Sequence, residues 1–181
     1  PDNCGPYSPI FTSNAVTNGG GVNNWNWSFG DGQSSTSQNP SHFYSNEGSY
    51  DVSLSVETIE GCTADVTYPN LINVYAFPQA MFSASPTNPT TENTTVAFTD
   101  VSNDAIQWNW NFGNNQGGSN EQNPVYDYPS TPGDYNVELI VTNSFGCQDT
   151  NDLTITISEQ LIFYVPNLFT PDGDAFNETF S

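Results

Sequence analysis

One run of residues occurs twice in this chain, and that repeat constrains the fold more than any other feature. The run Trp-Asn-Trp-Ser-Phe-Gly at residues 25–30 returns 83 residues later as Trp-Asn-Trp-Asn-Phe-Gly at residues 108–113. Three further landmarks return in the same order, with the offset growing only to 85: Gln-Asn-Pro (38–40 and 122–124), Gly-x-Tyr-x-Val-x-Leu-x-Val (48–56 and 133–141) and Gly-Cys (61–62 and 146–147). Landmarks in unchanged order indicate one fold used twice.

Within each copy the apolar residues recur with a period of two. Tyr, Val, Leu and Val alternate with polar residues over 50–57, and the aromatic residues of 25–29 and 108–112 share one face in the same way. This alternation is typical of strands with one buried and one wet face. Turn residues interrupt the chain about every ten positions. We therefore expect an all-β fold of short strands packed as a sandwich.

Residues that tolerate a positive φ follow both Trp strands. Gly30-Asp31-Gly32 stands in copy one, and Gly113-Asn114-Asn115 takes its place in copy two. Glycine and asparagine both suit tight hairpin turns, so the shared property is backbone shape and not carboxylate chemistry. A glycine two residues before Tyr50 and Tyr135 suggests the corner at which a tyrosine hydroxyl bonds back to the backbone in immunoglobulin-like sandwiches.

These motifs together resemble the polycystic-kidney-disease (PKD) domain family. The resemblance is carried by W-N-W-S-F-G-D-G, Q-N-P-S-H-F-Y, G-S-Y-D-V-S-L-S-V and G-C, and copy two departs from it at the Gly-Asp-Gly turn. It implies tandem immunoglobulin-like β-sandwiches of about seven strands in two sheets. We predict sandwich 1 over residues 1–76 and sandwich 2 over 77–159. The junction Tyr75-Ala76-Phe77-Pro78 contains a proline and is expected to limit bending between them.

The C-terminal residues carry a second resemblance. The string V-P-N-x-F-T-P-D-G-D, within residues 163–180, is similar to the opening of the gliding-motility-associated C-terminal domain, which marks proteins exported by the type IX secretion system (type B) of Bacteroidota. Residues 160–181 would be the N-terminal part of that targeting domain, whose further strands the chain does not include. The resemblance implies recognition by the type IX machinery and by an outer-membrane partner of the PorP/SprF type. The residues implied in recognition are Tyr164, Val165, Pro166, Asn167, Phe169, Thr170, Pro171, Asp172, Gly173 and Asp174.

The charge balance excludes several functions. The 181 residues include 20 Asp and Glu but no Lys or Arg, which gives a formal net charge of −20. Nucleic acids and anionic membranes are held by Lys and Arg, so neither is an expected partner. Arg clamps and catalytic lysines are excluded for the same reason. No stretch approaches the ~18 apolar residues of a membrane span, and the lack of an initiator Met or signal-like segment suggests an internal fragment.

Catalytic residues are not expected. His42 is the single histidine, and no metal-ligand or triad cluster accompanies it in the sequence. Two carboxylates would suffice for a glycosidase, but Asp31 is replaced by Asn114 and Asp51 by Asn136 between the copies. We predict a non-enzymatic chain with no catalytic residue, and a site unique to one copy remains the alternative.

The three cysteines and one acidic turn are the candidate cross-link and metal sites. Cys62 and Cys147 occupy matching positions, whereas Cys4 has no counterpart in copy two. We predict a Cys4–Cys62 disulfide, which an extracellular setting favours, with Cys147 left as a buried apolar thiol or a link to something outside the fragment. In the C-terminal segment, oxygen-bearing side chains around a glycine turn could bind calcium, and the alternative is a polar turn. The predicted ligands are Asp172, Asp174 and Asn177.

The aromatic residues could serve either as core or as a sugar platform. Trp25, Trp27, Trp108 and Trp110 would be the platform, but their period-two placement favours the core. We predict a non-catalytic stalk and interaction segment of a large secreted cell-surface adhesin of the gliding-motility type. It would be extracellular, attached to the outer membrane of a Gram-negative bacterium and able to meet extracellular polysaccharide or surface ligands. The alternative is a set of accessory modules, binding polysaccharide or protein, in a secreted hydrolase.

Overall fold

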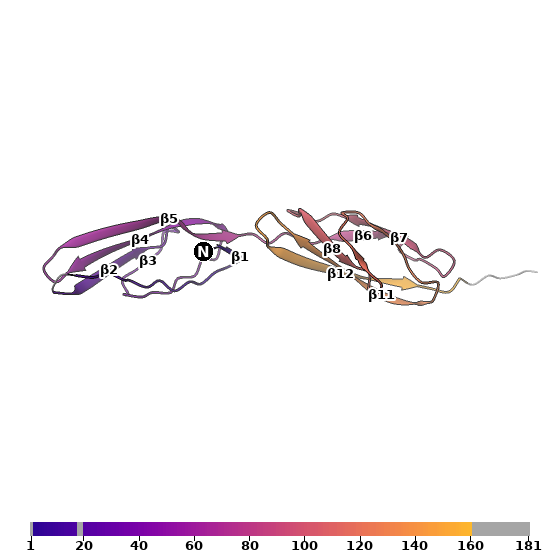
Figure 1. Ribbon diagram of the computed structural model, residues 1–181, viewed down its shortest axis with the longest axis horizontal. Coiled ribbons are helices and arrows are strands. Elements are labelled where there is room, and N and C mark those ends of the chain that lie inside the picture. The colour runs from indigo at the N-terminus through magenta and orange to yellow at the C-terminus, as the bar shows by residue number, and fades with distance from the viewer. Residues whose placement is uncertain (1, 18–19, 161–181) are drawn as a thin grey trace, which may run out of the picture.

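The computed structural model describes residues 2–17 and 20–160 and contains no helix in this part, hence none that could cross a membrane. Two β-sandwiches lie end to end and give the described chain an elongated shape (Figure 1). The strands are β1 (Asp2–Cys4), β2 (Val22–Ser28), β3 (Ser34–Ser35), β4 (Gly48–Thr58), β5 (Thr63–Tyr75), β6 (Phe82–Ser85), β7 (Thr95–Asp100), β8 (Gln107–Asn111), β9 (Gly118–Ser119), β10 (Val125–Asp127), β11 (Gly133–Thr142) and β12 (Gln148–Ile157). We call β1 to β5 module one and β6 to β12 module two. The predicted all-β architecture is confirmed.

Module one is built on one large sheet. Its strand order is β1-β5-β4-β2-β3, with β1 parallel to β5 and the other neighbours antiparallel. Two extended segments, one with Tyr7 and Ile10 and the other with Ser41 and Tyr44, cover one face of this sheet. Isolated bridges join Tyr7 to Tyr44 and Ile10 to Ser41. Their side chains and those of the large sheet enclose a core that includes Phe11, Trp27 and Phe29.

Module two has two regular sheets. The larger sheet has the order β12-β11-β8-β9 and the smaller one the order β10-β7-β6. Its core repeats that of module one. Phe98 packs against Trp110 and Phe112 with ring centroids 5.5 and 5.4 Å apart, where Phe11 packs against Trp27 and Phe29 at 5.6 and 5.3 Å.

The second Trp of each repeated run is a core residue. Trp27 is 6% exposed and Trp110 is 1% exposed, and each indole N–H donates to a backbone carbonyl, on Ser37 at 3.1 Å and on Glu121 at 2.8 Å. Burial of the ring with a satisfied N–H is how tryptophan stabilises a core most strongly. These two rings are therefore closed to a sugar ligand, while Trp25 and Trp108 are half-buried at the margins of the two cores.

The predicted positive-φ turns are present in both modules. Gly30 has a φ of +82° and Gly113 a φ of +80°. A Cβ atom at either position would lie 2.5 Å from a backbone carbonyl oxygen, on Asp51 or Asn136, so glycine is required on steric grounds as well. The predicted tyrosine corner is present in module one, where the Tyr50 hydroxyl donates to the Asn46 carbonyl at 2.9 Å.

Tyr44 and Tyr128 are buried at equivalent positions of the two cores, and their hydroxyl groups differ in hydrogen bonding. The Tyr44 hydroxyl donates to the Phe29 carbonyl at 3.0 Å, whereas that of Tyr128 is buried without a partner among the described residues. Burial raises the pKa of both phenols, so both hydroxyls stay protonated at neutral pH. We expect Tyr44→Phe to lower the free energy of unfolding by about 1 kcal/mol and Tyr128→Phe to leave it unchanged or raise it. Denaturant unfolding of the two matched variants measures this difference, and equal destabilisation would contradict it.

Candidate functional site

The described residues hold no group of three or more His, Cys, Asp or Glu side chains that could bind a metal ion. His42 instead contacts one carboxylate, with its Nε2 2.7 Å from Asp31 Oδ2, and its ring stacks on Phe29 at 4.1 Å. In module two, Tyr126 and Asn114 make the same contact between uncharged groups, at 2.7 Å. Burial raises the pKa of Asp31, but the bonds from His42 and the Gln33 N–H outweigh it and hold that pKa below its ordinary range. In each module this contact joins the turn that follows the Trp strand to the segment that carries His42 or Tyr126.

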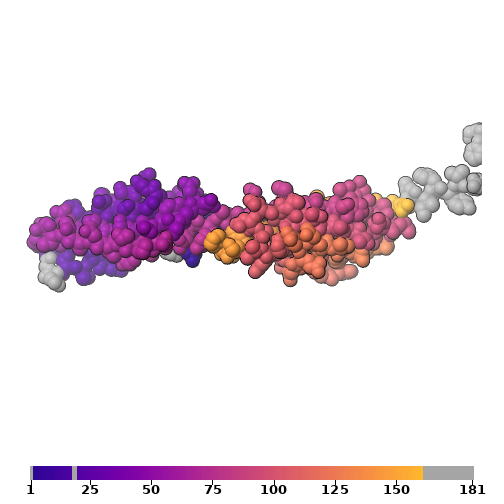
Figure 2. Space-filling model, turned by 90° about the horizontal axis from the view of Figure 1, so that it is seen from above, coloured from indigo at the N-terminus to yellow at the C-terminus, as the bar shows by residue number. Residues whose placement is uncertain are grey.

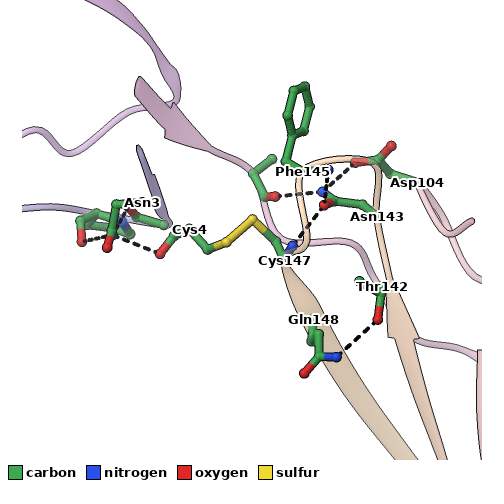
Figure 3. Close-up of a disulfide and its surroundings, with 11 residues drawn as sticks. Asn3, Cys4, Asp104, Thr142, Asn143, Phe145, Cys147 and Gln148 are labelled. Atoms are coloured by element: carbon green, nitrogen blue, oxygen red, sulfur yellow. Dashed lines mark hydrogen bonds between the residues drawn. A yellow bond between two sulfur atoms is a disulfide. The ribbon is translucent and has the colours of Figure 1, made fainter. Parts of the chain in front are cut away.

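The contact that stands out in this structure lies where the modules meet. A disulfide joins Cys4, at the end of β1 in module one, to Cys147, in the hairpin between β11 and β12 of module two (Figure 3). The predicted Cys4–Cys62 bridge is therefore wrong, and so are both alternatives for Cys147, a buried thiol and a link outside the fragment. Cys62 is the free cysteine, and it is exposed.

The length of β5 explains the correction. Cys4 pairs with Tyr75 at the end of β5, and Cys62 lies just before its first residue, Thr63. A strand of 13 residues at about 3.3 Å each separates the two cysteines by roughly 40 Å, far beyond the reach of a disulfide. The same hairpin position in module two faces module one, and this brings Cys147 to within 5.6 Å of Cys4 between Cα atoms.

Asn143 organises the hairpin that carries Cys147. Its side-chain amide donates to the Ala76 carbonyl in the linker and to Asp104 Oδ2, both at 3.1 Å. Its side-chain oxygen accepts the backbone N–H groups of Phe145 and Cys147 at 3.0 Å (Figure 3). Asn143 is only 2% exposed, and a buried amide with every bonding position used holds its neighbours in one arrangement.

Aromatic and backbone contacts complete the junction. The Phe145 ring of module two stacks on Tyr75 of module one, with ring centroids 4.1 Å apart and planes at 7°. The Phe77 ring lies against Gly5, where a Cβ would come within 2.4 Å of it and where φ is +71°. Figure 2 shows the β11–β12 hairpin filling the space between the modules without a gap. Disulfide, buried amide and ring stack together restrict hinge motion, a stronger restraint than the proline that the sequence suggested.

Module one also carries an apolar groove of about 310 Å³. Val66 and Tyr68 of β5 line it and are 40% and 54% exposed, although they pair with the buried Leu54 and Val52 on the core-facing side of the sheet. Thr12 and Ser13 also line it, as does Trp27 of β2, which pairs with Leu54 in the same sheet. An uncovered core-facing surface marks a place where the covering layer is short of a strand.

Module two shows which strand fills the equivalent place. Phe98 N–H donates to Pro124, as Phe11 N–H donates to Pro40, so β7 corresponds to the segment around Phe11. Strand β6 pairs with β7 and places Phe82 against Trp110, with ring centroids 4.9 Å apart. Among the described residues, nothing pairs with the matching edge of module one. The part of the groove beside Trp27 thus corresponds to the place that Phe82 of β6 takes beside Trp110.

The acidic residue next to Trp108 has a structural role. Asp100 accepts the Trp108 indole N–H at 2.8 Å and the Gln122 amide at 3.0 Å. Ser13 takes the same role toward Trp25 in module one, at 3.2 Å. Burial raises the pKa of Asp100, but the bonds from Ser102, Gln122 and Trp108 outweigh it and hold the pKa below its ordinary value of 3.8.

Two sets of predicted residues lie outside the described part of the chain. They are the calcium ligands Asp172, Asp174 and Asn177, and the export-recognition residues from Tyr164 to Asp174. The predicted targeting segment, residues 160–181, falls there except for Gln160, so both predictions stand as the sequence made them.

The repeated cores are matched by a family comparison. The sequence model of the PKD domain matches residues 7–72 and again residues 76–157, which together exceed half of the chain. The chain belongs to the PKD domain family. Both matches fall on the sandwiches, and these PKD domains include β2 to β12, apart from the last three residues of β5, but not β1.

Individual relatives match shorter parts of the chain. A microbial collagenase of Vibrio alginolyticus is 51% identical over 47 residues, which are 26% of this chain and 6% of the collagenase. The PKD1 domain of Vibrio anguillarum Epp is 26% identical, with a TM-score of 0.40, over 46% of this chain and 96% of that domain. The PKD1 domain of the Vibrio cholerae metalloprotease PrtV is 29% identical, with a TM-score of 0.40, over 45% and 98%.

The clamp between the PKD domains predicts a change in shape upon its removal. We expect the double variant Cys4→Ser with Cys147→Ser to keep both PKD domains folded, because each has its own core. Its pair-distance distribution from small-angle X-ray scattering should broaden and shift to shorter maximum lengths, because only the linker and non-covalent contacts remain. Cys62→Ser is the matched control and should scatter like the unmodified protein. An unchanged distribution in the double variant would show that the disulfide does not set the shape.

The lowered pKa of Asp100 predicts a pH-dependent contribution to stability. A carboxylate with a lower pKa in the folded state stabilises the fold above its unfolded pKa, and this contribution is lost as the pH falls through the folded-state value. We expect the unmodified protein to be more stable than Asp100→Asn at pH 7. The gap should stay constant down to about pH 5 and shrink below 3.8. Urea unfolding at several pH values measures it, and a gap independent of pH would refute the role of the charge.

Proposed function

We propose that this chain is a non-catalytic stalk segment of a large cell-surface adhesin of the gliding-motility type. The observation that carries the proposal is the clamped junction, in which the Cys4–Cys147 disulfide, Asn143 and the Tyr75–Phe145 stack restrict two PKD domains to an end-to-end arrangement. A stalk needs this property, because each bend at a joint shortens the reach of whatever the stalk carries.

The chemistry of the surface supports a passive role. A net charge of −20 with no Lys or Arg keeps copies of the chain apart and soluble. Disulfides persist in oxidising environments, which favours an extracellular location for a chain clamped by one. The absence of Lys and Arg also removes every cleavage site for trypsin-like proteases, an advantage for a protein exposed outside the cell.

The route to the surface is part of the proposal. The segment that begins near Tyr164 would direct export by the type IX secretion system and contact an outer-membrane partner of the PorP/SprF type. The protein would thus be held on the outer membrane of a Gram-negative bacterium. The support for this step is the V-P-N-x-F-T-P-D-G-D string in the sequence.

Surface labelling tests location and route together. Antibodies against the PKD domains should label intact cells of the native bacterium, and the label should disappear from a strain that lacks the type IX channel. Labelling that persists in the mutant strain would refute export by this route. Label that appears only in broken cells would refute the surface location.

A second candidate function has one specific observation in its favour. The 47-residue match to a Vibrio collagenase suggests accessory modules that bind a polymer for a hydrolase elsewhere in the protein. The groove beside Tyr68 would then be the binding surface, since Trp27 and Trp110 are buried.

A sedimentation assay with insoluble collagen and chitin separates the two functions. We expect a stalk segment to remain in the supernatant with both polymers. Retention that Tyr68→Ser abolishes would favour the accessory function, because this exposed side chain can be changed without opening the core. Leu153→Ser, at a similarly exposed site in module two, is the control for a non-specific loss of apolar surface.

A further inference from the structure

The two modules present their hairpin cysteines in the same turn. In module one, Thr58 N–H donates to the Cys62 carbonyl at 2.8 Å, and in module two Asn143 N–H donates to the Cys147 carbonyl at 3.0 Å. The side-chain oxygens of Thr58 and Asn143 accept the N–H groups of Cys62 and Cys147 at 3.2 and 3.0 Å. The glycine before each cysteine has a φ of +82°. The backbone therefore holds both sulfur-bearing residues alike.

Only one of these two cysteines forms a disulfide. Cys147 faces the preceding module and is bonded to Cys4. Cys62 is exposed at the β4–β5 hairpin, at the end of module one that points away from module two (Figure 1). By the internal repeat, this is the end at which a preceding module would stand.

We propose that Cys62 is the site of a second interdomain disulfide, formed with a preceding PKD-type sandwich that carries a cysteine at the position of Cys4. The Cys4–Cys147 bridge is then one link of a series, each running from the N-terminal strand of one module to the hairpin of the next. The inference rests on the proposed stalk function, because it needs a further module. Two thiols lose two protons and two electrons, which a disulfide oxidant takes up as it becomes two thiols.

The groove on module one fits the same partner. In module two the strand that fills this place, β6, comes directly from the linker that follows β5 of module one. Thr90 forms a parallel bridge with Ser158, just as Cys4 pairs in parallel with Tyr75. Thr90 therefore corresponds to Cys4. By the same offset, the position that corresponds to Phe82 would lie before Pro1. A preceding module would thus supply both the sulfur for Cys62 and, through its linker, a strand for the groove.

The correspondence between Thr90 and Cys4 also shows where the proposed series of interdomain disulfides ends. Because Thr90 stands where Cys4 stands, module two offers no sulfur to a module that follows it. The disulfide series therefore runs only toward the N-terminus.

A three-module chimera tests the proposal. Residues 1–86 are placed directly ahead of Pro1–Ser181, which keeps the repeat in phase because Pro1 corresponds to Thr87. The protein is refolded in a glutathione redox buffer, and its disulfides are mapped by mass spectrometry. We expect Cys4 of the added copy to be linked to Cys62 of the following copy, with Cys62 of the added copy as the one free thiol.

Matched variants separate the possible outcomes. In the chimera, Cys62→Ser in the following copy should leave Cys4 of the added copy open to alkylation, with the Cys4–Cys147 bridge unchanged. A Cys62 that stays reactive in the chimera while that bridge is intact would overturn the proposal and leave the stalk function untouched. Sequencing the native gene distinguishes the two failures. A protein without a preceding sandwich would count against the stalk and the bridge together, whereas a preceding sandwich without a cysteine at the position of Cys4 would overturn the bridge alone.

A second chimera tests whether the native β4–β5 hairpin is able to make the contact with a preceding module. It carries Thr58→Asn and Glu60→Phe in the following copy, which installs the side chains that Asn143 and Phe145 provide in module two. Formation of the bridge in both chimeras supports the proposal. A bridge that forms only with these two changes would overturn it, since the native hairpin would then not make the contact.

Discussion

The arrangement of the two sandwiches depends on a single covalent contact, the Cys4–Cys147 disulfide, and on the buried amide beside it. The sulfur atoms join a strand of the first module to a hairpin of the second across 143 residues of sequence. Asn143 keeps that hairpin in place by bonding to the linker carbonyl of Ala76 and to the Cys147 N–H. Without these contacts the modules would be joined by a short linker alone, and such joints usually bend.

Each module has its own hydrophobic core. A pair of aromatic rings from the Trp-x-Trp-x-Phe strand packs on the alternating face of the longest hairpin, and a glycine of positive φ turns the chain close to the neighbouring strand. The repeat kept these features and exchanged the polar ones: Ser13 for Asp100, and His42 with Asp31 for Tyr126 with Asn114. Because each exchange preserves a hydrogen bond and not a charge, the acids serve packing and solubility more than chemistry.

The sequence allowed the fold to be predicted, but not the contact between the modules. Period-two alternation, the repeated turns and the PKD motifs identify tandem sandwiches, since these are local signals that each copy carries twice. The disulfide pairing is not local. The repeat shows that Cys62 and Cys147 are equivalent, but only the length of β5 and the end-to-end stacking reveal that a hairpin cysteine meets the neighbouring module and not its own. The role of Asn143 could not be predicted for the same reason, because nothing near it in sequence indicates that it is buried.

Disulfide mapping of the native chain tests the central claim most directly. Free thiols are alkylated under non-reducing, denaturing conditions, and the protein is digested with a protease that cleaves after acidic or aromatic residues, because trypsin has no site. The clamped junction predicts a cross-linked peptide pair that contains Cys4 and Cys147, with the alkyl group on Cys62. A pair that contains Cys4 and Cys62, or alkylation of all three cysteines, would contradict it.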